Sequence, residues 1–189
     1  MKVIQLFKND ALLIKRAAAG NRQAQRKIYE KHSAKMLSIC RQYVKDLHHA
    51  EEVMLNGFFK VFTHLKDFRD EGSFEGWMRQ IMVRESISFL RTDKRSMFAE
   101  DEVPENADFS YCFTSEFNAA HIQKVIDSLP EGYKMVFLMY AVEGYKHHEI
   151  AKMLNITEGT SKSQLFKARK MLQEKLEQEN KTEYGTGKI

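Results

Sequence analysis

One apolar stripe, repeated at helical spacing over five turns, runs through residues 47–65. Its members recur every three or four residues: Leu47, Ala50, Met54, Phe58, Val61 and Leu65. This spacing places one face of an α-helix in a core. Strand-like alternation is absent, and only two prolines and nine glycines occur among 189 residues. The chain is therefore expected to be all-α.

Other segments carry the same helical period. Besides residues 47–65, helices are expected over residues 10–19, 22–44, 74–95, 119–128 and 130–143. Pro130 suits a helix start, because its missing N–H has no intrahelical partner there, and Gly144 is a natural stop. The tail from Asn180 is expected to be frayed.

An acidic segment divides the chain. Residues 99–118 read AEDEVPENADFSYCFTSEFN, contain no Lys or Arg, and include Pro104. The absence of helical periodicity is typical of a linker. We expect one helical domain over residues 1–96, a flexible acidic linker over 97–118, a second helical domain over 119–180 and a tail over 181–189.

Composition narrows the class of protein. Lys and Arg number 30 against 26 Asp and Glu, a mild excess of +4 that does not by itself identify a nucleic-acid partner. No apolar run approaches membrane-spanning length, and the N-terminus lacks a long apolar signal core. Cys40 and Cys112 stand alone, without a disulfide framework. These features predict a cytoplasmic protein with no membrane segment.

Residues 147–170, HHEIAKMLNITEGTSKSQLFKARK, read as two helices joined by a tight turn. Asn155 tolerates the left-handed conformation that ends a helix, and Thr157 is placed to cap the next one. The second helix has an apolar stripe and a basic remainder: Leu165, Ala168, Leu172 and Leu176 on the stripe, and Lys162, Gln164, Lys167, Arg169 and Lys170 elsewhere. This pattern predicts a helix-turn-helix.

Two interpretations of this motif stay open on its own residues. The second helix could enter the major groove of DNA, or the motif could be a plain helical corner with a solvated basic face. Basic helix faces are common in proteins, so the motif favours DNA binding without deciding it.

Catalytic and metal sites find little support in the sequence. His48–His49 and His147–His148 are adjacent pairs, which point in different directions from a helix, whereas ligands on one helix face need spacings of three or four. There is no Gly-rich phosphate loop, nucleophile elbow or carboxylate dyad. Neither a metal, a cofactor nor an enzymatic activity is expected.

Aromatic and basic residues are interleaved in residues 74–95. By composition alone, Phe74 and Trp77 are first read as core residues. Rings close to Arg84 and Arg91 also suit single-stranded DNA, with rings for bases and cations for phosphates, and Phe89 fits either role.

Together these segments resemble the extracytoplasmic-function sigma factors of bacterial RNA polymerase, from about residue 8 to residue 178. AEEVMLNGFFKVF (50–62) is similar to the family's polymerase-docking segment, and FEGWMRQIMVRESISFLR (74–91) to its promoter-melting and −10-reading helix. IDSLPEGYKMVFLMYAVEGYKHHEIAKMLNITEGTSKSQLFKAR (126–169) resembles its sigma-4 domain. The resemblance implies two small helical domains, a sigma-2 bundle and a sigma-4 helix-turn-helix, joined by a flexible acidic linker.

The resemblance also implies partners and site residues. Core RNA polymerase would be held by Glu51, Glu52, Asn56 and Lys60. The duplex −35 element would be read by Thr160, Lys162, Ser163, Gln164 and Lys167. The melted −10 element would be met by Phe74, Arg79, Arg84, Ser88, Arg91, Lys94 and Arg95, with the loop 68–74 capturing a flipped base. An anti-sigma factor is a further possible partner, and outside its complexes the chain is expected to be a monomer.

The sequence departs from the family at several of these positions. Leu55-Asn56 stand where the family often has Gln-Glu, and Arg84 and Ser88 stand where Asn and Asp are common. In the recognition helix, Ser161 and Gln164 replace the usual Val and Arg. The promoter sequence preference therefore does not carry over from the family.

Two rival functions remain on the sequence alone. A free-standing helix-turn-helix regulator would bind specific DNA without polymerase, usually as a dimer. A sigma-like adaptor would bind polymerase or an anti-sigma partner without reading promoters.

Overall fold

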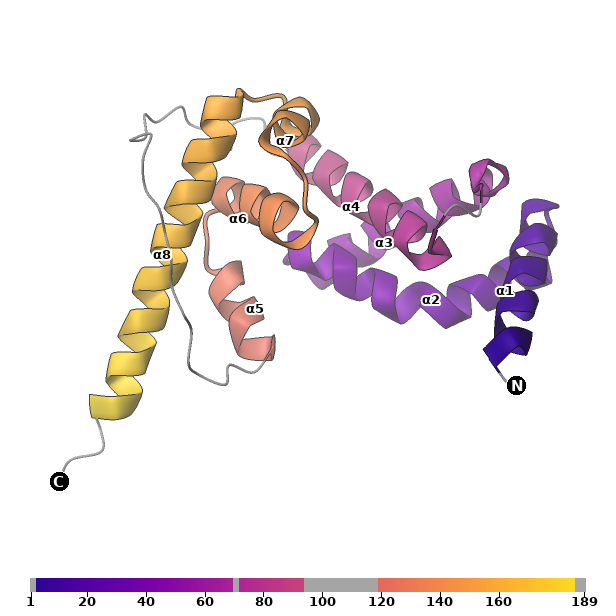
Figure 1. The fold of residues 1–189 in the computed structure, drawn as a ribbon, viewed down its shortest axis with the longest axis horizontal. Helices are drawn as coiled ribbons and strands as arrows, with labels where there is room; N and C mark the ends of the chain where they lie inside the picture. Colours follow the sequence, from indigo (N-terminus) through magenta and orange to yellow (C-terminus); the bar gives the residue numbers. More distant parts are fainter. Residues whose placement is uncertain (1–2, 70–71, 94–118, 186–189) are drawn as a thin grey trace. The chain divides into compact units, whose positions relative to one another are not determined.

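The computed structural model describes residues 3–69, 72–93 and 119–185, and every regular element within them is helical (Figure 1). This confirms the expected all-α fold. The chain forms two compact units, Met1–Asp93 and Lys94–Ile189. The acidic segment 99–118, expected to be a linker, lies outside the described residues.

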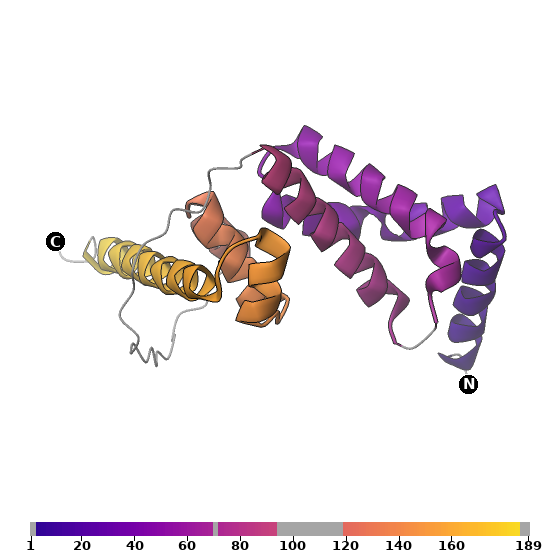
Figure 2. The same cartoon turned by 90° about the horizontal axis from the view of Figure 1, so that it is seen from above.

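The first unit is a helical bundle. Its elements are α1 (Val3–Ala18), α2 (Arg22–Tyr43), α3 (Leu47–Thr63), a 3₁₀ turn (Leu65–Asp67) and α4 (Phe74–Asp93). Helices α2, α3 and α4 each pack against the other two (Figure 2). Side chains cap α2 and α3 at their starts: Asn21 accepts a hydrogen bond from the Ala24 N–H at 2.9 Å, and Asp46 accepts one from the His49 N–H at 2.8 Å.

Helices α3 and α4 approach closely at Gly57. A Cβ atom built there would lie 2.3 Å from the sulfur of Met82, so only glycine fits without a shift of that side chain. Met82 itself is fully buried, as are Met78 on the same helix and Val61 on α3. The interface thus fixes α4, the predicted −10 helix, against α3, the predicted polymerase-docking helix.

The second unit is built around the first half of α8. Its elements are α5 (Ala119–Asp127), α6 (Glu131–Phe137), a π-helical turn (Leu138–Val142), α7 (His147–Leu154) and α8 (Glu158–Gly185). Helices α6 and α7 pack on α8, and the last turns of α8 extend beyond both (Figure 1). The buried Lys134 is neutralised by Asp127, 2.5 Å from its Nζ.

Three sequence predictions about the helices were wrong. The first helix begins at Val3, not near Asp10, and α8 continues to Gly185 instead of fraying from Asn180. The first extension contains no proline or glycine, and the second meets its first glycine only at Gly185, where α8 ends. Leu47, assigned to the apolar stripe, is 54% exposed, because it is the first residue of α3.

Among the described helices, none combines the length and the apolar character needed to cross a membrane.

Candidate nucleic-acid and polymerase interfaces

The turn between α7 and α8 has the geometry that its sequence predicted. Asn155 ends α7 in the left-handed region, at φ 57° and ψ 49°. The hydroxyl of Thr157 accepts a hydrogen bond from the Thr160 N–H at 2.9 Å, which caps α8. This confirms a helix-turn-helix fixed by its own turn chemistry.

Polar contacts join α7 to α8. Nδ1 of His147, at the start of α7, lies 2.9 Å from the hydroxyl of Ser161 on α8. Burial lowers the pKa of His147, and the nearby Lys162 lowers it further, so the imidazole is neutral at pH 7 and able to share this hydrogen bond. The contact sets the position of the first turn of α8 relative to α7.

An aromatic ring lies next to this contact. Tyr140 stacks on His147 with ring centroids 4.7 Å apart, and the guanidinium of Arg169 lies 5.6 Å from the Tyr140 ring centroid. Tyr140 belongs to the π-helical turn, in which the Glu143 N–H donates to the Leu138 carbonyl. Such turns widen a helix locally, and this one directs Tyr140 towards the helix-turn-helix.

The five residues predicted to read the −35 element differ in exposure. Lys162 is exposed and Lys167 half-buried, whereas Thr160, Ser163 and Gln164 are buried, Gln164 to 2% exposure. The Thr160 hydroxyl shares a hydrogen bond with Thr157 at 2.8 Å, and the Ser163 hydroxyl donates to the Thr160 carbonyl at 2.9 Å. These three side chains are buried within the second unit, and their contact with base edges stays a prediction.

The exposed face of α8 contains residues that were not in the set predicted to read the −35 element. Arg169 and Lys170 are exposed and Phe166 is half-buried. Lys162, Phe166 and Arg169 follow one another at spacings of four and three, which places them on one side of the helix. That spacing could have identified these residues from the sequence, because it places them on a different side of the helix from the apolar stripe.

Removal of the α8 cap gives a first testable result. Thr157→Ala is expected to lower the free energy of unfolding of the second unit by about 1 kcal/mol, because the Thr160 N–H loses its side-chain acceptor. Urea denaturation followed by circular dichroism measures the change. Thr92→Ala, which removes an exposed hydroxyl that donates to the Ser88 carbonyl of its own helix, is the control and should change stability little.

In the first unit, three of the seven predicted −10 residues share one exposed face of α4. Arg84, Ser88 and Arg91 are exposed, and Trp77 and Gln80 extend the same face towards the start of the helix. Arg79 is half-buried and lies on the opposite side of α4, because residues two positions apart point to nearly opposite sides of a helix and Arg79 follows Trp77 by two. Lys94 and Arg95 lie outside the described residues.

A hollow opens where this face begins. It measures about 390 Å³ and is lined by Asp67, Phe68, Arg69, Ser73, Gly76, Trp77 and Gln80. The rings of Phe68 and Trp77 are 5.5 Å apart, and Phe74 stacks behind them, 5.2 Å from Phe68 and 5.9 Å from Trp77. Trp77 is therefore both a packed residue and a wall of an open site, and Phe74 supports that wall without lining the hollow.

The predicted polymerase-docking residues all lie on the exposed side of α3. Glu51, Glu52 and Asn56 are exposed, and Lys60 at the edge of this face pairs with Glu85 of α4 at 2.5 Å. The sequence prediction missed two apolar residues among them: Leu55 is 54% exposed and Phe59 is 72% exposed. Large apolar side chains gathered on an exposed helix face are typical of a docking surface.

Comparison with known proteins gives two family matches. The model of Sigma-70 region 2 matches residues 28–96, and the model of Sigma-70, region 4 matches residues 120–172. The ECF RNA polymerase sigma-E factor of Haemophilus influenzae is 24% identical over 181 residues, covering 89% of this chain and 95% of that protein. The RNA polymerase sigma factor SigV of Bacillus subtilis is 25% identical over 149 residues, covering 79% and 89% respectively.

A solved structure was also found. It is the sigma factor RpoE of Bartonella quintana, in complex with the anti-sigma factor NepR, at 17% identity and a TM-score of 0.49. The alignment covers 80% of this chain and 96% of that one.

The two matched regions coincide with the bundle that carries the α4 face and with the unit that carries the helix-turn-helix, and together they span more than half of the chain. A chain with these two regions is a sigma factor, the subunit that directs RNA polymerase to promoters. This chain belongs to the sigma-70 family, in its extracytoplasmic-function group.

Proposed function

We propose that this sigma factor holds core RNA polymerase through α3, reads the −35 duplex through the exposed face of α8, and captures an unpaired base of the −10 element in the hollow at the start of α4. The observation that carries the proposal is the hollow itself, walled by Phe68 and Trp77 and continuous with the cationic face of α4.

Base capture would couple binding to strand opening. Unstacking one base costs a few kcal/mol, and stacking on an aromatic ring offsets about 1–3 kcal/mol of that cost. Arg84 and Arg91 on the same face of α4 are placed to hold the phosphates of the opened strand. Opening then needs no ATP, and the protein acts as a binding subunit rather than an enzyme.

At the −35 element, we infer that Lys162, Arg169 and Lys170 make the approach to the duplex. These three cations are exposed on α8, within its first four turns. Arginine and lysine bind phosphates and guanine edges, so the face suits the entry of a recognition helix into the major groove. Arg169 is held by the Tyr140 ring, which reduces the conformational freedom lost on binding.

The acidic segment joins the two sites in the proposed complex. Glu100, Asp101, Glu102, Glu105, Asp108 and Glu116 carry its charge. We infer that it threads towards the channel for nascent RNA, where negative charge occupies a place that RNA later takes. Joining the −10 and −35 units in one chain also raises the effective concentration of each at the promoter.

The protein would act in the cytoplasm, as a monomer outside its complexes. Because the B. quintana sigma factor was solved with an anti-sigma factor, we infer that this chain also has an anti-sigma partner.

In vitro transcription tests the proposal. Full-length protein is combined with core RNA polymerase of its own organism and a fragmented genomic template, and start sites are mapped. Discrete starts absent with core alone are expected, together with permanganate-reactive thymines in the −10 region before any nucleotide is added. Starts without such thymines would refute the base-capture step.

Two other outcomes would point to the rival functions. Binding to core without any new start site would favour a sigma-like adaptor. Specific DNA binding by the protein alone, with no affinity for core, would favour a free-standing regulator.

A further inference from the structure

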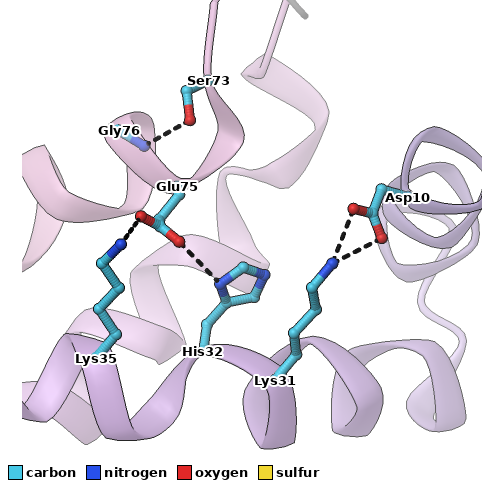
Figure 3. Close-up of polar contacts among 7 residues, drawn as sticks. All are labelled: Asp10, Lys31, His32, Lys35, Ser73, Glu75 and Gly76. Atoms are coloured by element: carbon cyan, nitrogen blue, oxygen red, sulfur yellow. Dashed lines mark hydrogen bonds and ion pairs between the residues drawn. The ribbon is translucent and has the colours of Figure 1, made fainter. Parts of the chain in front are cut away.

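The first turn of α4 is tied to α2 by a charged cluster that includes none of the proposed DNA-binding residues (Figure 3). The carboxylate of Glu75 accepts a hydrogen bond from Nζ of Lys35, and its second oxygen lies 3.9 Å from Nδ1 of His32. Lys35 and His32 lie one turn apart on α2. Glu75 thus spans from one helix to the other.

The same turn carries the rings beside the hollow. Glu75 lies between Phe74 and Trp77 in the sequence, and the His32 ring meets the edge of the Phe74 ring with centroids 6.0 Å apart. The hydroxyl of Ser73 accepts a hydrogen bond from the Gly76 N–H at 3.3 Å, so the turn is capped locally (Figure 3). That cap shapes the turn, while the contacts of Glu75 and Phe74 position it against α2.

The charges support an ion pair at neutral pH. The hydrogen bond from Lys35 holds the pKa of Glu75 below its ordinary value, so the carboxylate is ionised. Burial lowers the pKa of His32, and Lys31 lowers it further, so this imidazole is neutral at pH 7. Lys31 is itself paired with Asp10 of α1, at 2.8 Å, which leaves Lys35 as the cation for Glu75.

We propose that Glu75 is a positioning residue for promoter opening. Through Lys35 it holds the first turn of α4 against α2, where the His32 ring also meets the edge of Phe74, and so keeps Phe74 and Trp77 in the arrangement that receives an unpaired base. This inference rests on the proposed base capture by the hollow. It assigns to Glu75 a role without any contact between Glu75 and DNA.

A first experiment uses the fluorescence of Trp77, the only tryptophan of the chain. In full-length protein, Glu75→Gln should change the emission of Trp77 and make it easier to quench with acrylamide, because the first turn of α4 loses its tie to α2. Glu30→Gln is the matched control, since it removes an exposed ion pair with Arg26 elsewhere on α2. Identical quenching of wild type and Glu75→Gln would overturn the proposal.

A second experiment measures base capture. Holoenzyme is assembled on a promoter mapped by transcription, with 2-aminopurine placed at successive non-template positions of the −10 element. The equilibrium fluorescence gain that reports an unstacked base should fall about two- to fivefold with Glu75→Gln, the range expected for one partly exposed ion pair. Exchange of the pair, Glu75→Lys with Lys35→Glu, should restore it, and Glu30→Gln should leave it unchanged.

The possible outcomes distinguish failure of base capture from failure of the positioning role of Glu75. If the wild type gives no fluorescence gain at any position, base capture itself fails. If the wild type captures a base and Glu75→Gln does so equally well, only the positioning role fails. Loss of binding to core polymerase by Glu75→Gln would also count against it, because the inference leaves the α3 surface unaffected.

Discussion

Phe59→Glu is expected to bind core RNA polymerase at least roughly thirtyfold more weakly than the wild type, the change that corresponds to losing a binding hot spot of about 2 kcal/mol. Phe59 is 72% exposed on α3, one turn after the exposed Leu55 and between the predicted docking residues Asn56 and Lys60. An exposed aromatic ring contributes binding free energy when a partner buries it. A glutamate at the same position would instead add a charge that has to be desolvated on binding.

The effect should be specific to docking. Because Phe59 is exposed, its replacement removes little packing within the bundle, and thermal unfolding should change little. Leu12→Glu is the matched control, since Leu12 is also an exposed apolar residue of the first unit but lies on α1. Competition with labelled wild-type protein for core polymerase measures the affinities.

Substitutions at Leu55 test whether its difference from the usual family residue matters for polymerase binding. The family often has glutamine at this position, so Leu55→Gln should weaken docking only modestly, and less than Leu55→Glu. Unchanged affinity of Phe59→Glu would show that polymerase uses another face of the bundle.

The fold was largely predictable because its main signals are local. The stripe from Ala50 to Leu65 is buried as its spacing predicted. Asn155 and Thr157 adopt the conformation and the hydrogen bond that their chemistry favours. Each of these features depends on residues within a few positions of each other, which a sequence displays directly.

The sites were less predictable, because they depend on which side of a helix is covered. Gln164 is polar and precedes Leu165, so the sequence assigned it to the solvent side, yet packing covers both. Phe59 lies one position after the buried Phe58 and was overlooked because an apolar residue is usually assigned to the core. Only the packing of neighbouring helices distinguishes these cases.

Contacts between distant segments could not be predicted at all. Lys35 and Glu75 are 40 residues apart, and nothing in either segment indicates the other. The resemblance placed base capture at the loop 68–74, but the pairing of Phe68 with Trp77 as walls of the hollow was not indicated by the sequence. Neither pairing forms a pattern in the sequence: the ion pair depends on how α4 lies against α2, and the ring pair on how α4 lies against the segment after the 3₁₀ turn.

The second large effect is expected at the −35 element. Lys162→Ala should weaken binding of the holoenzyme to promoter duplex by about 1–3 kcal/mol if Lys162 contacts a base, with relaxed preference at one −35 position. If it contacts only phosphate, binding should weaken uniformly, and the slope of log affinity against log salt should fall by about one. Fluorescence anisotropy at several salt concentrations separates the two modes.

Gln164→Ala decides which face of α8 meets the DNA. Gln164 is buried, so its replacement should lower the stability of the second unit while leaving the preferred −35 sequence unchanged. Lys124→Ala, at an exposed lysine of α5 outside the helix-turn-helix, controls for the loss of one positive charge.

If instead Gln164→Ala altered the preferred base and Lys162→Ala bound as the wild type does, α8 would have to turn its buried face to the groove. Because that face also carries Ser161 and its contact with His147, such a turn would break the link between α7 and α8. The two substitutions therefore test the orientation of the whole helix-turn-helix, not only the role of one lysine.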